Sequence, residues 1–173
     1  MKHLKQWCKN NNKKLRVAGC VRGDTEAENR FYADKLNGSD WEYFARLDIY
    51  STYILIDSAK IVVTIDSTMG YEAIARGKKT AFFSCRGLSL NREDRKFGWP
   101  ADLPNNGPFW TNDQNEAQFQ RVMDYLNTVS VECWEQNRQR YATELMEFDP
   151  GNTRFVALLD ELLPKLETQS HAK

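Results

Sequence analysis

The sequence predicts an α/β fold: a Rossmann-like three-layer domain with a mainly parallel sheet, helices on both faces, and extra C-terminal helices. Short β-branched or aromatic runs alternate with helical segments along much of the chain. With 173 residues, 41% of them hydrophobic, the chain can bury one sizeable core. We therefore expect a single domain over residues 1–166, followed by a disordered tail at 167–173.

The clearest unit is a strand–helix–strand segment between residues 61 and 84. The apolar run Ile61–Ile65 is too short for a helix, and its continuous hydrophobicity predicts a strand covered on both faces. A helix is expected to begin at Ser67 or Thr68 and to end at Gly77-Lys78, before a second strand at Thr80–Phe83.

The flanking segments supply the other expected elements. N-terminal to this unit, the pattern predicts helices at 4–11, 26–36 and 50–59, and strands at 15–20 and 41–44. Residues 85–114 contain three prolines and three glycines, which is typical of a functional or mobile loop, and a brief strand is expected at 109–111. Helices are predicted at 116–126, 131–148 and 153–166, with apolar stripes that pack into the core.

The turn after the first strand of the unit favours an anion. Ser67 and Thr68 can cap the helix, and Gly70 allows the backbone to approach a ligand. Free N–H groups and the helix dipole make such a helix start favourable for a phosphate or carboxylate. The alternative is that Ser67 and Thr68 only cap the helix.

Ligands of parallel sheets gather beyond the carboxyl ends of the strands. Arg22 and Arg86 each follow a predicted strand, so two arginines converging on one helix start would hold a diphosphate by bidentate bonds. Either arginine could instead be an ordinary surface residue. Asp66 has three open roles: it could cap the helix, orient Arg86 or face an acceptor.

Over about residues 50–87, the chain resembles the donor-binding C-terminal domain of GT-B glycosyltransferases, especially bacterial enzymes of surface-polysaccharide biosynthesis. The residues that carry the resemblance are Asp66-Ser67-Thr68, Gly70, Glu72-Ala73 and Gly77-Lys78 after a buried strand. It implies that Ser67, Thr68 and Gly70 face the diphosphate of a nucleotide-sugar and that Glu72 binds the ribose. It also implies transfer without a metal or other cofactor.

The function expected from this resemblance is that of the nucleotide-sugar-binding half of a glycosyltransferase, acting on a surface polysaccharide or glycolipid acceptor. A complete GT-B enzyme has two such domains, and this chain has the length of one, so catalysis is expected to need an acceptor-binding domain or partner chain. Catalytic residues are not identifiable. The alternatives are half of a sugar-nucleotide epimerase and a non-enzymatic nucleotide-sugar binding module.

Charge and cysteine content restrict the other possibilities. The 24 basic and 24 acidic residues cancel, which argues against a nucleic-acid binder. Residues 1–16 hold six Lys or Arg and no acid, which fits either peripheral contact with a membrane or the solvated face of a helix. The four cysteines lack metal-site spacing, and strand alternation explains Asp40 and Glu42 better than a metal triplet does. With no span or secretory signal, a cytoplasmic location is expected.

Overall fold

The computed structural model describes residues 1–143 and 145–170, and their order of helices and strands confirms the α/β class. The α-helices are α1 (Lys2–Asn10), α2 (Thr25–Leu36), α3 (Ser51–Ser58), α4 (Thr68–Ala75), α5 (Arg86–Ser89), α6 (Glu116–Thr128), α7 (Val131–Ala142) and α8 (Thr153–Ser170), and η1 (Glu93–Arg95) is a 3-10 helix. The strands are β1 (Leu15–Ala18), β2 (Trp41–Phe44), β3 (Val62–Thr64), β4 (Thr80–Phe83), β5 (Asn106–Gly107) and β6 (Trp110–Thr111).

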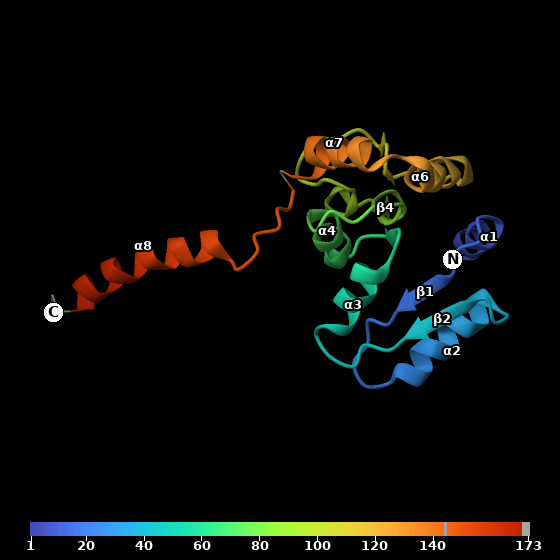
Figure 1. Cartoon of the computed structure of the whole chain (residues 1–173), viewed down its shortest axis with the longest axis horizontal. Coiled ribbons are helices and arrows are strands. Elements are labelled where there is room, and N and C mark those ends of the chain that lie inside the picture. Colours follow the sequence, from blue (N-terminus) through green and yellow to red (C-terminus); the bar gives the residue numbers. More distant parts are fainter. Residues whose placement is uncertain (144, 171–173) are drawn as a thin grey trace.

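The strands form two small sheets. β1 and β2 pair in parallel, with Leu15 opposite Trp41. The second sheet has the order β3-β4-β6-β5, in which β3, β4 and β6 are parallel and β5 is antiparallel to β6. Figure 1 shows β1, β2 and α2 on one side of the body and β4, α4, α6 and α7 on the other.

One detail of the predicted burial is wrong. Ile61 to Thr64 are all half-buried, whereas the sequence predicted a strand covered on both faces. The reason is that β3 is an edge of its sheet in the described structure, with β4 as its hydrogen-bonded neighbour. β4 is the strand that is deeply buried, with Ala81 and Phe82 fully inaccessible.

An aromatic core joins β4 to the segment that follows it. The rings of Phe82 and Phe97 lie 4.5 Å apart, and those of Phe97 and Trp110 lie 5.0 Å apart. Helix α1 closes the core on another side, because Trp7 is buried and its Nε1 donates to Asp124 of α6 at 2.9 Å. These contacts tie the first helix to the C-terminal half of the chain.

The segment predicted as a functional or mobile loop is anchored by one aromatic side chain. Phe97 is 1% exposed, and its N–H donates to the buried side chain of Asn112 at 3.0 Å. The next N–H, of Gly98, donates to Tyr71 of α4 at 3.3 Å. The loop is therefore fixed at its middle, and α5 and η1 carry four of its charged residues, Arg86, Glu93, Asp94 and Arg95.

The C-terminal helices differ from expectation in two ways. Helix α7 ends at Ala142 rather than at residue 148, because Leu145 packs against the core and Phe148 lies 5.1 Å from the guanidinium of Arg76. Helix α8 projects away from the body (Figure 1). Its apolar stripe is not core: Phe155, Leu158, Leu159 and Leu162 are between 37% and 59% exposed. The helix continues to Ser170, and residues 171–173 of the expected tail lie outside the described residues.

Candidate functional site

The start of α4 lies where the sequence predicted it. Ser67 is the N-cap, and its Oγ accepts a hydrogen bond from the N–H of Met69 at 3.3 Å. The N–H of Ser67 itself donates to Oγ1 of Thr64 at 3.3 Å, which fixes the turn against β3. Ser67 and Thr68 are exposed, so this helix start is accessible from solvent. Whether they contact a phosphate stays a prediction.

Gly70 has a packing role that the sequence did not indicate. A Cβ at this position would lie 2.4 Å from Cγ2 of Thr64 and 3.0 Å from the ring of Phe82. Such distances are far inside van der Waals contact, so glycine is required for α4 to lie this close to the sheet. The Cα face of Gly70 that would carry a side chain points toward the sheet, and a contact between its backbone and a ligand stays a prediction.

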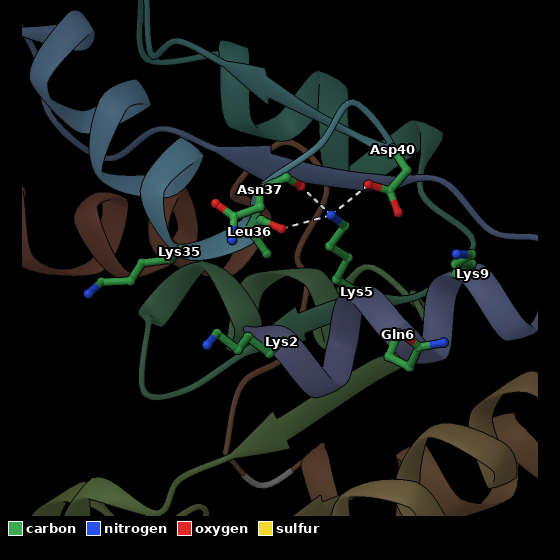
Figure 2. Close-up of a pocket in the computed structure, with 8 residues that line it drawn as sticks. All are labelled: Lys2, Lys5, Gln6, Lys9, Lys35, Leu36, Asn37 and Asp40. Carbon is green, nitrogen blue, oxygen red and sulfur yellow. Dashed lines mark hydrogen bonds and ion pairs between the residues drawn. The ribbon is translucent and has the colours of Figure 1, made fainter.

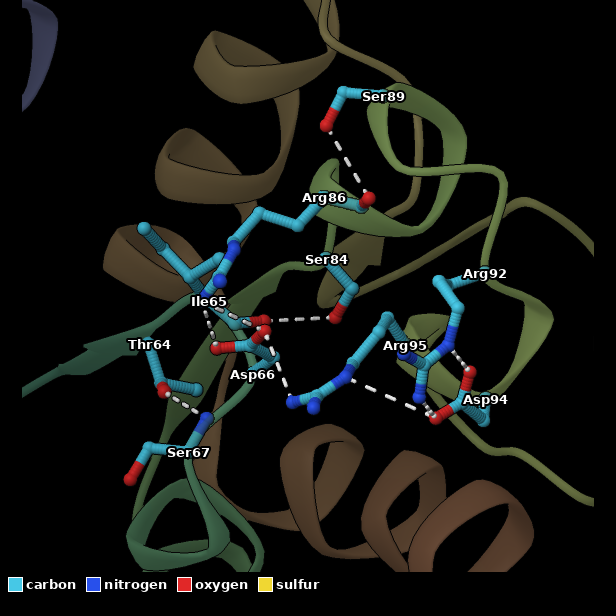
Figure 3. A network of polar contacts seen from close by, with 10 residues as sticks. All are labelled: Thr64, Ile65, Asp66, Ser67, Ser84, Arg86, Ser89, Arg92, Asp94 and Arg95. Atoms are coloured by element: carbon cyan, nitrogen blue, oxygen red, sulfur yellow. Dashed lines mark hydrogen bonds and ion pairs between the residues drawn. The ribbon is translucent and has the colours of Figure 1, made fainter.

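Asp66 gathers two arginines at the carboxyl end of β3 (Figure 3). Its Oδ2 lies 3.1 Å from Nη1 of Arg86 and 3.7 Å from Nη1 of Arg95. The side chain of Asp66 is 17% exposed, whereas those of Arg86 and Arg95 are 53% and 43% exposed. Of the three roles left open for Asp66, the structure shows the orientation of Arg86. The buried hydroxyl of Ser84 holds the neighbouring strand ends together by donating to the carbonyl of Ile65 at 2.9 Å.

A second carboxylate completes this arginine cluster, which we define as Asp66, Arg86, Arg92, Asp94 and Arg95. Arg92 makes two hydrogen bonds to Asp94, at 2.7 and 2.6 Å, and Nε of Arg95 lies 3.8 Å from the same carboxylate. Hydrogen bonding to Arg92 lowers the pKa of Asp94. Three guanidinium groups and two carboxylates leave the cluster with a net positive charge.

Glu72 is held by a neighbouring helix. The hydroxyl of Tyr53, on α3, donates a hydrogen bond to Oε2 of Glu72, and this bond raises the pKa of Tyr53. Arg76 lies 5.7 Å from the ring of Tyr53 and forms a 2.7 Å ion pair with Asp57. The carboxylate of Glu72 is thus oriented, and an ionised carboxylate retains lone pairs for further donors. Its contact with a ribose stays a prediction.

The end of β1 does not join this cluster. Arg22 is exposed and lies near Asp48, whose pKa is lowered mainly by hydrogen bonds from Ser51 and Tyr50 and to a smaller extent by Arg22. Within the described part of the chain, no hydrogen bond or ion pair links Arg22 to Asp66, Arg86 or Arg95. The arginine that converges with Arg86 on Asp66 is therefore Arg95, and not Arg22 as the sequence predicted. A ligand contact by Arg22 stays a prediction.

A carboxylate from α2 occupies the β1 end instead. Glu28 accepts hydrogen bonds from the N–H groups of Cys20 and Val21, at 3.1 and 3.3 Å, and from the hydroxyl of Tyr43 at 2.7 Å. Burial and the bond to Glu28 raise the pKa of Tyr43 to about 12. The backbone amides of Cys20 and Val21 are therefore already bonded to a protein carboxylate.

Sequence reasoning did not assign Arg95, Glu28 and Tyr53 to these roles. Arg95 belongs to a charged run, 92–96, that looks like an ordinary solvated surface. Phe97, two residues later, is buried in the aromatic core, and Arg95 lies 3.7 Å from Asp66 in the folded chain. No local spacing in the sequence carries that information.

Neither a metal cluster nor a membrane span is found in the described ranges. No group of three or more His, Cys, Asp or Glu side chains there is arranged to hold a metal ion. Asp40 forms an ion pair with Lys5, and Glu42 pairs with Lys14, so the acidic residues of β2 and the preceding turn are engaged with lysines. No helix among these residues is both long and apolar enough to cross a bilayer.

The fold and the strand-end cluster define an α/β protein of the Rossmann-like class with a cationic site at the carboxyl edge of its parallel strands. Residues 1–163 match the family described as "putative O-antigen biosynthesis protein", and the chain belongs to this family. Comparison with curated proteins and with solved structures gave no match.

Proposed function

We propose that the chain is the nucleotide-sugar-binding half of a glycosyltransferase that acts in O-antigen biosynthesis. The family description supports the biosynthetic role. The single observation that carries the chemistry is the convergence of Arg86 and Arg95 on Asp66, immediately before the cap of α4. Two half-exposed guanidinium groups beside a helix start form a site for a doubly charged diphosphate.

Arg86 and Arg95 have N–H donors that Asp66 does not occupy and that such a ligand can accept from. A guanidinium carries five N–H donors, and Asp66 engages a single nitrogen, Nη1, of Arg86 and of Arg95. Asp66 holds the two side chains in position before the ligand arrives, which reduces the entropy lost on binding. The exposed Ser67 and Thr68 would contribute the amino end of α4, and Glu72, oriented by Tyr53, would accept from the ribose hydroxyls.

The reaction itself would be completed by a second domain. In the arginine cluster, cationic side chains and a helix N-terminus are suited to stabilising a diphosphate leaving group. Neither His3 nor His171 is a good candidate for a general base, because they lie at opposite extremes of the chain. We therefore infer that an acceptor-binding domain or partner chain supplies the base and the acceptor.

Binding of nucleoside diphosphates to the purified chain tests this proposal. Isothermal titration with UDP, GDP and CDP should identify one ligand that binds. Arg86→Ala and Arg95→Ala should each weaken it by about 1.5 to 3 kcal/mol, the range for hydrogen bonds to charged groups. Arg154→Ala is the matched control, because Arg154 is also exposed and paired with a carboxylate, that of Glu147.

Two results would count against the proposal. One is absence of binding to all three diphosphates by protein shown to be folded. The other is an equal loss of affinity in Arg154→Ala. Sugar transfer by the isolated chain should be slow or undetectable, and robust turnover without a second domain would contradict the inferred need for a partner.

A further inference from the structure

A second basic surface, separate from the arginine cluster, lies on α1 and the C-terminal end of α2. We define the lysine face as Lys2, Lys9, Lys13 and Lys35. Three of these, Lys2, Lys9 and Lys35, line an open depression of about 260 Å³, and Lys9 and Lys13 line a neighbouring one of about 380 Å³. Figure 2 shows Lys2 and Lys35 extending to the same side of the first depression.

Lys5 builds this surface without contributing free charge to it. Its ammonium donates to the carbonyls of Leu36, at 2.7 Å, and Asn37, and it forms a 2.7 Å ion pair with Asp40 (Figure 2). Lys5 therefore joins α1 to the C-terminal end of α2. It also neutralises Asp40, the acid among the residues that line the two depressions.

The four lysines of the lysine face keep their charge for an outside partner. Within the described part of the chain, none of them forms a hydrogen bond through its ammonium or an ion pair. Two acids on other elements are paired with other cations: Glu42 with Lys14, and Glu116 with His3 at 3.0 Å. A chain with no formal net charge thus carries an uncompensated cationic surface on its first helix.

We propose that the lysine face binds the anionic surface of a lipid membrane. Its charges sit on flexible stems around open depressions, and the arginine forks that grip a phosphate of fixed geometry are absent from the lining residues. Separate point charges of this kind match a fluid layer of headgroup phosphates. Phe31 is 55% exposed and lies 5.7 Å from Nζ of Lys35, so an apolar ring borders the surface.

A nucleic acid fits this surface less well. Single-stranded binders stack bases on aromatic side chains within a basic groove, and duplex binders use several arginines. The residues that line the depressions include no aromatic side chain and no arginine. Duplex binding is therefore kept as an outcome of the test.

Co-sedimentation with lipid vesicles tests the proposal on the full chain. The protein should bind vesicles that contain equal parts of phosphatidylglycerol and phosphatidylcholine, and not vesicles of phosphatidylcholine alone. Each lysine near an anionic surface strengthens binding roughly five-fold. Lys9→Gln should weaken binding about five-fold and the triple change Lys2→Gln, Lys9→Gln, Lys13→Gln about 100-fold, and added salt should weaken binding by the wild type.

Lys60→Gln is the matched control, because Lys60 is exposed and lines neither depression. Circular dichroism should show all variants folded, since Lys5 is left in place. Failure to bind the anionic vesicles at low salt would overturn the proposal, as would an equal loss in Lys60→Gln. Retention by a DNA duplex without vesicle binding would assign the surface to nucleic acid instead.

Discussion

One acidic side chain lies at the carboxyl end of β1 and another at the carboxyl end of β3, and the two bind different kinds of donor. At β1, Glu28 accepts from the backbone amides of Cys20 and Val21, so a protein carboxylate takes the place that an anionic ligand would occupy. At β3, Asp66 contacts one nitrogen, Nη1, of Arg86 and of Arg95 and does not occupy their remaining donors. The amides of Cys20 and Val21 at the first strand end are bonded to a protein carboxylate, whereas the second strand end presents the guanidinium groups to which we assign the diphosphate.

The difference shows that the donor bonded to a carboxylate, a backbone amide or an arginine, decides whether the site keeps donors for a ligand. A carboxylate bonded to amides satisfies a fixed number of donors and fills the space in front of them. A carboxylate bonded to arginines holds side chains that have donors in excess. The two arrangements are therefore expected to respond differently to substitution and to pH.

The largest effect is expected from adding one methyl group at the β3 end. In Gly70→Ala the new Cβ meets the Thr64 methyl at 2.4 Å and the buried Phe82 ring at 3.0 Å. Overpacking of this kind costs about 1 to 3 kcal/mol, which exceeds the helix-propensity gain of alanine. Urea denaturation should show the loss.

Gly19→Ala is the matched change at the β1 end. Its Cβ would lie 2.5 Å from the hydroxyl of Tyr43, the far end of a side chain that can move, so the loss should be smaller than in Gly70→Ala. Equal losses in the two variants would contradict the claim that Gly70 is held by the core.

The next effect in size is the removal of Glu28. Glu28→Ala leaves the amides of Cys20 and Val21 and the Tyr43 hydroxyl without their acceptor. Because Glu28 is half-buried and water can replace some of these bonds, we expect a loss of about 1 to 2 kcal/mol in the free energy of unfolding. A variant as stable as wild type would show that the β1 end is not closed by Glu28.

A smaller effect on stability is expected at Asp66. Asp66→Asn removes the negative charge between two arginines that are about half exposed, so solvent screening limits the loss to less than about 1 kcal/mol. Denaturation should show that this variant is more stable than Glu28→Ala. The reverse order would mean that the arginine cluster serves mainly to hold the fold together.

The smallest effect is a pH dependence at Glu28. Burial acts to raise the pKa of this carboxyl, but hydrogen bonds from Cys20 and Tyr43 outweigh burial and lower the pKa below its usual 4.5. The unfolded chain therefore binds the proton more readily, so the contribution of Glu28 is complete above its usual pKa and is lost as the pH falls through the folded pKa.

Glu28→Gln isolates this contribution. As the pH falls from neutral through 4.5 and further into the acid range, wild type should lose more of its free energy of unfolding than Glu28→Gln does. Parallel losses in the two proteins would show that the carboxyl titrates in the folded state as it does in the unfolded chain.

Local patterns predicted the β3–α4–β4 unit closely. Its strands, the cap at Ser67 and the end at Gly77 all follow from residues adjacent in sequence, and Gly77 has the positive φ of +83° that favours glycine after a helix. The convergence of Arg86 and Arg95 on Asp66 was not predictable in this way. It depends on Phe97 packing among Phe82 and Trp110, which is a contact between separate elements.

The same reasoning explains the error at the C-terminus. The apolar stripe of the last helix predicted a helix that packs into the core. The helix is confirmed, but its predicted packing is wrong, because the stripe residues are exposed: Phe155, Leu158, Leu159 and Leu162. Amphipathic spacing indicates that one face is apolar, but it does not say what covers that face. In the described structure, α8 lies apart from the body and the face is exposed (Figure 1).

The amino-acid sequence by itself determined the α/β class, the order of its main helices and strands and the helix cap at Ser67, because helix periodicity, strand runs and caps are local properties. Only the tertiary structure decided which carboxylate closes a strand end and which one presents arginines. That choice depends on side chains far apart in sequence, and packing of the aromatic core brings the decisive residues together.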